Sequence, residues 1–279
     1  YASHLRQLDP YIGNLPLQSV HLGTLQPFIE DRRKQGRKNK TINLALSVVR
    51  RILNLSARLW RDDNGLTWLD TPPLIQMLPL TDARKPYPLS WGEQRTLFRA
   101  LPDHLARMCL FKVNTGCREQ EVCQLRWDWE VKVPELNTSV FLIPGDRVKN
   151  KEDRLVVLNR VAMSVIDELR GVHPEHVFTY KEHAVQTINN SAWKRARTLA
   201  GLRQVRVHDL KHTFGRRLRA AGVPLETRNV LLGHKNGDFT THYSAPELEE
   251  LIEAVNSVCA EKSGKSPALV MLKRKAVTG

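Results

Sequence analysis

VHDLKHT, residues 207–213, lies within the most basic stretch of the 279-residue chain. From Lys194 to Arg219 the sequence holds nine basic residues and one acidic residue. His208 and Lys211 are three positions apart at the start of an expected helix, so both side chains lie on one face of it. Such a concentration of basic side chains is typical of a surface that binds phosphate groups. The segment therefore predicts a helix with an anion-binding face.

The composition around this stretch is that of a folded globular protein. Hydrophobic residues make up 41% of the chain and charged residues 26%, which excludes a disordered tail, a collagen-like fibre and a coiled-coil rod. The length fits one large domain or two smaller ones. With 43 basic and 29 acidic residues, the net charge is +14, which indicates a polyanionic partner. Nucleic acid is the leading candidate, and a membrane surface is the second.

Cysteines and histidines give no sign of a disulfide framework or a metal site. The four cysteines are scattered and no pair has C-x-x-C spacing, so a reducing cytoplasm is the simplest setting. His208 and His212 have the spacing of a zinc motif, but that motif needs Glu after the first histidine, and Asp209 stands there. No apolar run reaches the ~18–20 residues of a membrane span. The first residues are not a signal peptide, and without an initiator Met we expect the chain to begin inside a longer protein.

Five prolines between residues 71 and 90 indicate a boundary between domains. Before it, we expect helices over residues 24–35 and 41–61, joined by the basic connection DRRKQGRKNK. After it, Ser90 and Glu93 form a predicted capping box. The chain is thus divided into a helical domain (1–82), a linker (83–90), a larger domain (91–260) and a tail (261–279).

The larger domain is predicted to alternate helices with one pair of strands. The β-rich runs 139–144 and 154–158 flank GDRVKNKED, which predicts a hairpin with a basic tip. In the tail, residues 268–272 are apolar and are expected to form one short strand or helix. Helices are expected over residues 104–115, 119–125, 160–170, 185–200, 209–221, 224–232 and 245–260.

Three further segments carry candidate functional residues. In TGCREQE (115–121), a Gly before a helix start followed by Arg118 suits an anion, with Glu121 placed to fix the arginine; a surface ion pair is the alternative. The hairpin tip holds Arg147, Lys149 and Lys151 and could supply a mobile lysine, although a solvated turn would look the same. LLGH (231–234) presents His234 after a helix end, and Tyr243 follows nine residues later.

In this order, TGCREQE, the basic hairpin, HDLKHTF, LLGH and the tyrosine resemble the tyrosine recombinase (phage integrase) family, over about residues 90–260. A prophage or mobile-element integrase is the nearest type. The resemblance implies a mostly α protein with a small β-sheet (α+β). It further implies a helical core-type DNA-binding domain and a catalytic domain that together form a C-shaped clamp on DNA.

The resemblance also implies roles for individual residues. Tyr243 would attack a DNA phosphodiester and form a 3′-phosphotyrosyl enzyme with a free 5′-hydroxyl. Arg118 would bind the scissile phosphate, and Lys149 would protonate the leaving 5′-oxygen. A phosphodiester transition state gathers negative charge on its equatorial oxygens, so preorganised cationic donors suit it. A tyrosine with a pKa near ~10 needs a base or a cationic surrounding to react at neutral pH.

By the same resemblance His208 assists proton transfer, His234 hydrogen-bonds a non-bridging oxygen, and Glu121 supports the site. One position departs from the family, which usually has H-x-x-R where this chain has Lys211. Lysine keeps the charge but loses the planar two-pronged guanidinium. Residues expected to bind the DNA backbone are Arg37, Lys38, Lys40, Arg147, Lys151, Lys194, Arg195 and Arg216.

The implied partners are double-stranded DNA with a specific core site, a homotetramer formed on that DNA, and accessory DNA-bending or directionality proteins, in a bacterial cytoplasm. No metal, ATP or other cofactor is expected, because the phosphotyrosyl bond keeps the energy of the cleaved linkage. An arm-type domain would lie upstream of Tyr1. Two alternatives remain open: a non-catalytic DNA-binding regulator with the same fold, and a DNA-relaxing enzyme of the topoisomerase type.

Overall fold

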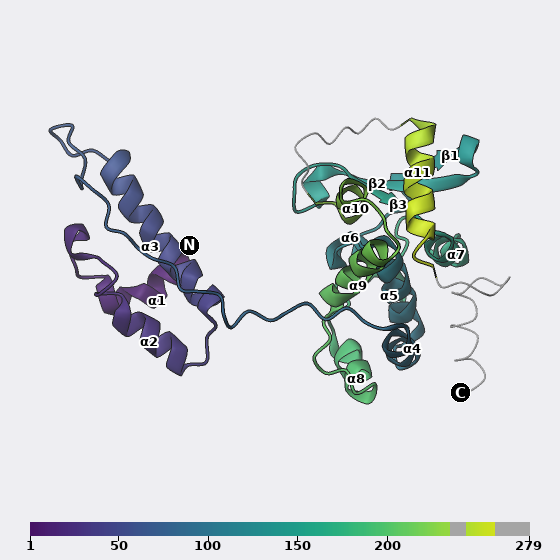
Figure 1. Cartoon of the computed structure of the whole chain (residues 1–279), viewed down its shortest axis with the longest axis horizontal. Coiled ribbons are helices and arrows are strands. Elements are labelled where there is room, and N and C mark those ends of the chain that lie inside the picture. The colour runs from purple at the N-terminus through teal and green to yellow at the C-terminus, as the bar shows by residue number, and fades with distance from the viewer. Residues whose placement is uncertain (235–243, 260–279) are drawn as a thin grey trace. The chain divides into compact units, whose positions relative to one another are not determined.

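The computed structural model describes residues 1–234 and 244–259. The chain divides into two compact units, one of residues Tyr1–Lys85 and a second that begins at Pro86. The division falls inside the segment interpreted as a linker. Helices dominate both units (Figure 1). Among the described residues, none of the helices is long and apolar enough to cross a membrane.

The first unit is a small helical domain built from α1 (Ala2–Ile12), α2 (Gln26–Lys34) and α3 (Asn39–Arg58). The apolar residues of α3 repeat at helical spacing and are buried against Leu8 and Phe28. Helix α3 begins where the backbone N–H of Asn39 donates to the Asp82 carboxylate at 2.7 Å. The two helices expected here are confirmed to within a few residues, whereas α1 was not expected.

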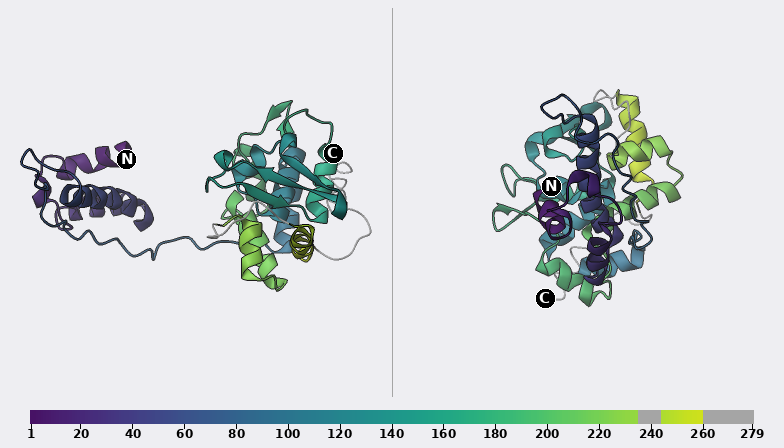
Figure 2. Two further views of the ribbon diagram at one scale, coloured as in Figure 1. Left: turned by 90° about the horizontal axis from the view of Figure 1, so that it is seen from above. Right: turned by 90° about the vertical axis from the view of Figure 1, so that its left-hand side faces the viewer.

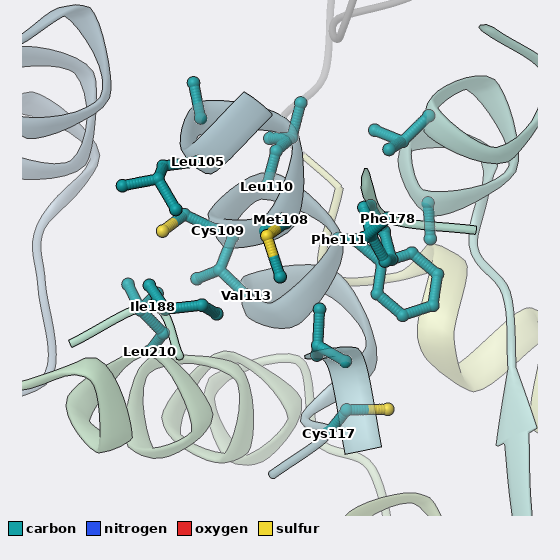
Figure 3. Packing of buried hydrophobic residues seen from close by; sticks show 14 of the residues in the cluster. Leu105, Met108, Cys109, Leu110, Phe111, Val113, Cys117, Phe178, Ile188 and Leu210 are labelled. Carbon is teal, nitrogen blue, oxygen red and sulfur yellow. The ribbon is translucent and has the colours of Figure 1, made fainter. Parts of the chain in front are cut away.

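Helix α5 (Asp103–Thr115) is the centre of the second unit. Ten of its 13 residues are buried, so it is surrounded by protein on nearly all sides. Figure 3 shows its side chains pointing outward into the core, where Phe178, Ile188 and Leu210 meet them. The neighbours that pack most closely on it are α7 (Arg160–Leu169) and α9 (Val207–Ala220). Before it, α4 (Trp91–Arg99) begins with the predicted Ser90–Glu93 capping box.

A three-stranded antiparallel sheet lies beside these helices (Figure 2). Its order is β1 (Glu130–Val133), β2 (Thr138–Ile143) and β3 (Arg154–Val157). The register pairs Phe141 with Val156 and so buries both in the main core. The hairpin of β2 and β3 is as predicted, but β1 was not expected. A second pair, β4 (Thr179–Tyr180) and β5 (His183–Ala184), was not expected either.

Four further helices complete the unit: α6 (Glu119–Cys123), α8 (Ser191–Leu199), α10 (Leu225–Leu232) and α11 (Ala245–Asn256). Residues 185–190 do not form the first part of a helix, as we expected them to. Instead the Glu119 carboxylate accepts from the backbone N–H groups of Ile188 and Asn189 at 2.8 and 2.9 Å, and Asn190 caps α8. Residues 268–272 lie outside the described part of the chain.

Candidate active site

The turn between α5 and α6 places Arg118. Gly116 ends α5 with φ of +65°, a left-handed conformation that glycine adopts without strain. A side chain at Gly116 would also collide with the ring of Phe214, because an added Cβ would lie 2.6 Å from it. The turn therefore packs directly on α9, and Arg118 stands at the start of α6.

Arg118 and Glu121 are joined at both backbone and side chain. The backbone N–H of Arg118 donates to one carboxylate oxygen of Glu121 at 2.6 Å, and the guanidinium donates to the other at 2.7 Å. Burial raises the pKa of the Glu121 carboxyl, but the charge of Arg154 and the hydrogen bonds from Arg118 outweigh it and hold that pKa below its usual value. Glu121 is therefore an anion, and it fixes a guanidinium that is still 23% exposed.

Lys211 is buried between the ends of two helices. Its ammonium donates to the carbonyl of Gly116 at 2.8 Å and to that of Leu232 at the end of α10. The residue is only 5% exposed. Burial, together with the nearby charge of Arg154, lowers the pKa of Lys211 to about 7. Two of its three N–H donors are thus used by the backbone, and one is left.

Arg154, the first residue of β3, is a buried cation that we did not count among the site residues. Its guanidinium donates to the carbonyls of Leu155 and Val230 at 2.7 and 2.8 Å, and also to that of Leu231. The residue is 3% exposed. An arginine that follows a basic hairpin and begins an apolar strand is the only sequence signal for it.

These cations share one kind of partner, which is the backbone carbonyl, and most of the carbonyls that they contact lie at helix C-termini. The last carbonyls of a helix lack intrahelical partners and carry the negative end of its dipole. Arg118 adds a hydrogen bond to Gly233 O at 3.1 Å, so the ends of α5 and α10 together hold Arg118, Arg154 and Lys211. Glu121 is the one buried carboxylate among the described residues that contacts the group. The centre therefore keeps excess positive charge, which suits a phosphate.

Two histidines flank this centre. His208 lies in the first turn of α9 with its ring edge-on to that of His212, at 4.7 Å between centroids. Partial burial of the imidazole, followed by the nearby His212, Lys112 and Lys211, lowers the pKa of His208 to about 4. His234 follows the left-handed Gly233 that ends α10. Burial, and then the charges of Lys211 and Arg118, lower the pKa of His234 as well. Both rings are therefore neutral at pH 7.

A small pocket opens between the hairpin and the end of α10. Arg118, Asn150, Arg154, Gly233 and His234 contribute to its lining, and its volume of about 20 Å³ has room for about one water molecule. Asn150 enters this pocket from the hairpin and donates to Gly233 O at 3.1 Å. Lys149, the lysine singled out in the sequence, is exposed beside it. Asn150 carried no sequence signal, because one Asn in a polar turn is ordinary.

Tyr243 lies outside the described residues, so the structure does not place the expected nucleophile. No group of three His, Cys, Asp or Glu side chains within the described ranges could hold a metal ion. The four cysteines are buried and unpaired by disulfides. All eight residues expected to bind the DNA backbone are exposed: Arg37, Lys38, Lys40, Arg147, Lys151, Lys194, Arg195 and Arg216.

Comparison with known proteins identifies the class. The profile of the phage integrase family matches residues 93–250, which is more than half of the chain. The chain therefore belongs to the phage integrase family, and the resemblance inferred from its motifs is confirmed. The expected fold class, mostly helical with a small sheet, is confirmed by the structure.

Individual relatives are distant. The integrase of Salmonella phage P22 is 26% identical over 226 residues, which are 76% of this chain and 56% of that protein. The tyrosine recombinase XerA of Thermococcus kodakarensis is 25% identical over 265 residues, which are 91% of this chain and 86% of XerA. The chain thus spans little more than half of the phage protein but most of XerA.

Solved structures share the fold. XerH recombinase bound to a palindromic difH substrate superposes with a TM-score of 0.62 at 19% identity, covering 89% of this chain and 74% of XerH. A lambda integrase dimer bound to a core site superposes with a TM-score of 0.65 at 15% identity, covering 87% of this chain and 90% of the integrase chain. These likenesses establish that the chain has the fold of the tyrosine recombinases.

Proposed function

We propose that this chain is a tyrosine-type site-specific DNA recombinase of the integrase kind. The observation that carries the proposal is the convergence of Arg118, Lys211 and His234 at the C-terminal ends of α5 and α10. A guanidinium, an ammonium and a neutral imidazole beside one another form a set of donors for a single phosphate. Their backbone partners hold them in place before the substrate arrives, which is how charge stabilisation lowers a barrier.

The reaction that fits these donors is transesterification. The Tyr243 oxygen attacks phosphorus and the bond from phosphorus to the 5′-oxygen breaks. The phosphorus keeps its bond to the 3′-oxygen of the DNA, so the cleaved strand is joined to the enzyme as a 3′-phosphotyrosine. The phenolic proton passes to a base, for which neutral His208 is the candidate, and Lys149 supplies a proton to the leaving 5′-oxygen. Attack by the 5′-hydroxyl of a partner strand then reverses these steps and rejoins the DNA, with no net consumption of bond energy.

Within this scheme Arg118 is assigned to the scissile phosphate and Glu121 to the positioning of Arg118. Lys211 takes the place that arginine usually has in the family, with its one remaining N–H for a phosphate oxygen. His234 donates to a non-bridging oxygen. Arg154 donates its hydrogen bonds to carbonyls and is assigned to support of the site.

We further infer that the first unit is a core-type DNA-binding domain. Arg37, Lys38 and Lys40 cluster at the N-terminal end of α3, all exposed. The dimer on a core site and the tetramer on a Holliday junction that lambda integrase forms support a homotetramer on DNA for this chain. The C-shaped clamp, accessory proteins and a bacterial cytoplasm stay predictions.

The test begins with binding, because the target site is unknown. The full chain first selects a binding site from duplexes with a randomised centre, and the selected duplex is then made with a nick next to each candidate scissile phosphate. We expect wild type to form a covalent adduct that survives SDS, that mass spectrometry assigns to Tyr243, and that Tyr243→Phe does not form.

Each alternative has its own result. Selective binding without an adduct at any nick position would make the chain a DNA-binding regulator. Relaxation of supercoiled plasmids that lack the selected site would make it a topoisomerase. Tyr243→Phe must still bind the selected duplex as tightly as wild type, since the hydroxyl is needed for bond formation and not for backbone contacts.

A further inference from the structure

Lys112 is a second fully buried lysine, and the scheme above does not use it. It lies in α5 and is 0% exposed. Its ammonium donates to the carbonyl of Cys117, in the turn that leads to Arg118. Burying an ammonium in a protein core costs folding free energy. A buried lysine is therefore a reason to look for a structural or functional role.

The bond from Lys112 fastens one end of a single peptide group. The carbonyl of Cys117 and the N–H of Arg118 belong to the same planar unit. Lys112 holds the carbonyl, and Glu121 accepts from the N–H at 2.6 Å. Rotation of this plane would have to break both bonds, so the direction in which the chain enters Arg118 is fixed.

The preceding peptide group is held in the same way from the other side. The carbonyl of Gly116 accepts from Lys211 at 2.8 Å. Two ammonium groups, one from α5 and one from α9, therefore hold two consecutive carbonyls of the turn. Gly116 adds its contact with Phe214, so the turn has no spare space in which to adjust.

We propose that Lys112 is a positioning residue for the phosphate site: its buried side chain fixes the peptide plane before Arg118. This inference rests on the proposed function for its catalytic consequence. Lys112 itself is too deeply buried to touch DNA, so its effect reaches the substrate through Arg118.

The charges around Lys112 come from three elements. Burial lowers the pKa of the ammonium; Cys117 in the turn, Glu121 and Glu119 on α6, and Cys109 on α5 oppose this. For His208, on α9, burial is the largest cause of the lowered pKa; His212, Lys112 and Lys211 lower it further, and Asp209 raises it. Loss of positive charge at position 112 is therefore expected to raise the pKa of His208.

Lys112→Met tests the inference, because methionine has a similar length with neither charge nor donor. Methionine removes the cost of burying a charge but leaves the Cys117 carbonyl without its donor, so we expect the variant to fold with reduced stability. We expect adduct formation to slow by about 10- to 100-fold, since small misplacements of catalytic groups have effects of this size. Affinity for the selected duplex should be unchanged, and the His208 pKa, measured by NMR without DNA, should rise.

Met108→Leu is the matched control, because Met108 lies one turn earlier in α5 and is equally buried. It should leave the rate, the affinity and the His208 pKa at wild-type values. A Lys112→Met protein that keeps the wild-type rate would overturn the inference, whatever its His208 pKa. If Lys112→Met does not fold, Lys112→Gln, which keeps a neutral N–H donor but shortens the side chain, is tested for the same loss of rate.

Failure of the proposed function gives a different result. If wild type forms no adduct under any condition, the recombinase assignment falls. Hydrogen exchange of the Arg118 backbone N–H then still tests the inference, because it needs neither DNA nor activity: exchange should be faster in Lys112→Met than in wild type, and equal rates would overturn the inference.

Discussion

The ammonium of Lys211 donates to the carbonyl of Gly116 at 2.8 Å and so joins the first turns of α9 to the C-terminal end of α5. The same ammonium reaches Leu232 O at the end of α10. A lysine has one flexible charged head in place of the flat guanidinium that the family usually carries here. In this chain the ammonium donates to the backbone, where it hydrogen-bonds one carbonyl at the end of each of two helices.

Lys211 should make the stability of the protein depend on pH. Its folded pKa is about 7, below the ordinary value of 10.5, so the unfolded chain binds more protons between these two values. Its contribution to stability then rises with pH between about 7 and 10.5 and levels off below the folded pKa, where both states are protonated. Between pH 7.0 and 8.5, the contribution of Lys211 to the free energy of unfolding in urea should grow by about 1–2 kcal/mol.

Lys211→Met should remove most of that gain, since methionine does not titrate. The buried cysteines, whose pKa values are raised, lower stability as the pH rises, but they do so equally in both proteins and cancel in the comparison. Equal slopes in wild type and Lys211→Met would show that the ammonium is not buried as described.

Gly116→Ala should destabilise the second unit by about 2–4 kcal/mol, because the left-handed backbone and the clash with Phe214 both oppose a methyl group. Gly171→Ala is the matched control: its φ is +76° but nothing lies within 4 Å of an added Cβ. It should cost only about 1–2 kcal/mol, the backbone part. Denaturant unfolding of the two variants measures the difference, and equal losses would contradict the close packing of the turn on α9.

Lys149→Ala should slow adduct formation by about 100- to 10,000-fold, the range for loss of a general acid. A substrate with sulfur in place of the leaving 5′-oxygen should restore the rate, since a thiolate leaves without a proton. Lys151→Ala, two residues away and also exposed, should keep the wild-type rate on both substrates at saturating duplex, since a backbone contact affects affinity. Loss of rate in Lys149→Ala that sulfur does not restore would assign the lysine to phosphate binding instead.

Lys194→Ala should weaken binding to all duplexes by a similar factor and reduce the salt dependence of log K by about 1, which is one phosphate contact. Lys194 is exposed on α8, in the most basic stretch of the chain. Lys34→Ala is the comparison, because Lys34 is an exposed lysine paired with Asp31 at 3.5 Å. Binding titrations from 50 to 300 mM salt measure the slope of log K against log salt concentration. An unchanged slope for Lys194→Ala would show that α8 is not part of the DNA-binding surface.

Local patterns were sufficient to predict much of the fold. The capping box of Ser90 and Glu93 and the apolar spacing of α3 depend on neighbours in sequence, and both are found. The error at residues 185–190 has a non-local cause, because Glu119 captures their backbone from almost 70 positions away. Strand β1 was missed because it is short and mostly exposed at the edge of the sheet, so it lacks an apolar pattern.

The same distinction applies to the site. The order of the motifs singled out Arg118, His208, Lys211 and His234 as candidates, because each motif is defined by side chains that can take part in the chemistry. Lys112 and Arg154 were missed because their partners are backbone carbonyls. Every residue has a carbonyl, so the sequence does not show which carbonyls a buried cation will contact. Nothing in FKVNTG shows that its lysine points inward, since burial there follows from the packing of α7 and α9 around α5.

The negative groups that face the cations of the site are mostly backbone carbonyls at helix ends. This limits the kinds of mutation that can damage the site. A substitution exchanges a side chain but leaves the carbonyls of Gly116, Leu232 and Gly233 where they are. A single-residue insertion or deletion within α5 or α10 rotates the helix end by about 100°, since there are about 3.6 residues per turn, and turns these carbonyls away from their cations. Variation in length, rather than in residue identity, is therefore what these two helices should tolerate least.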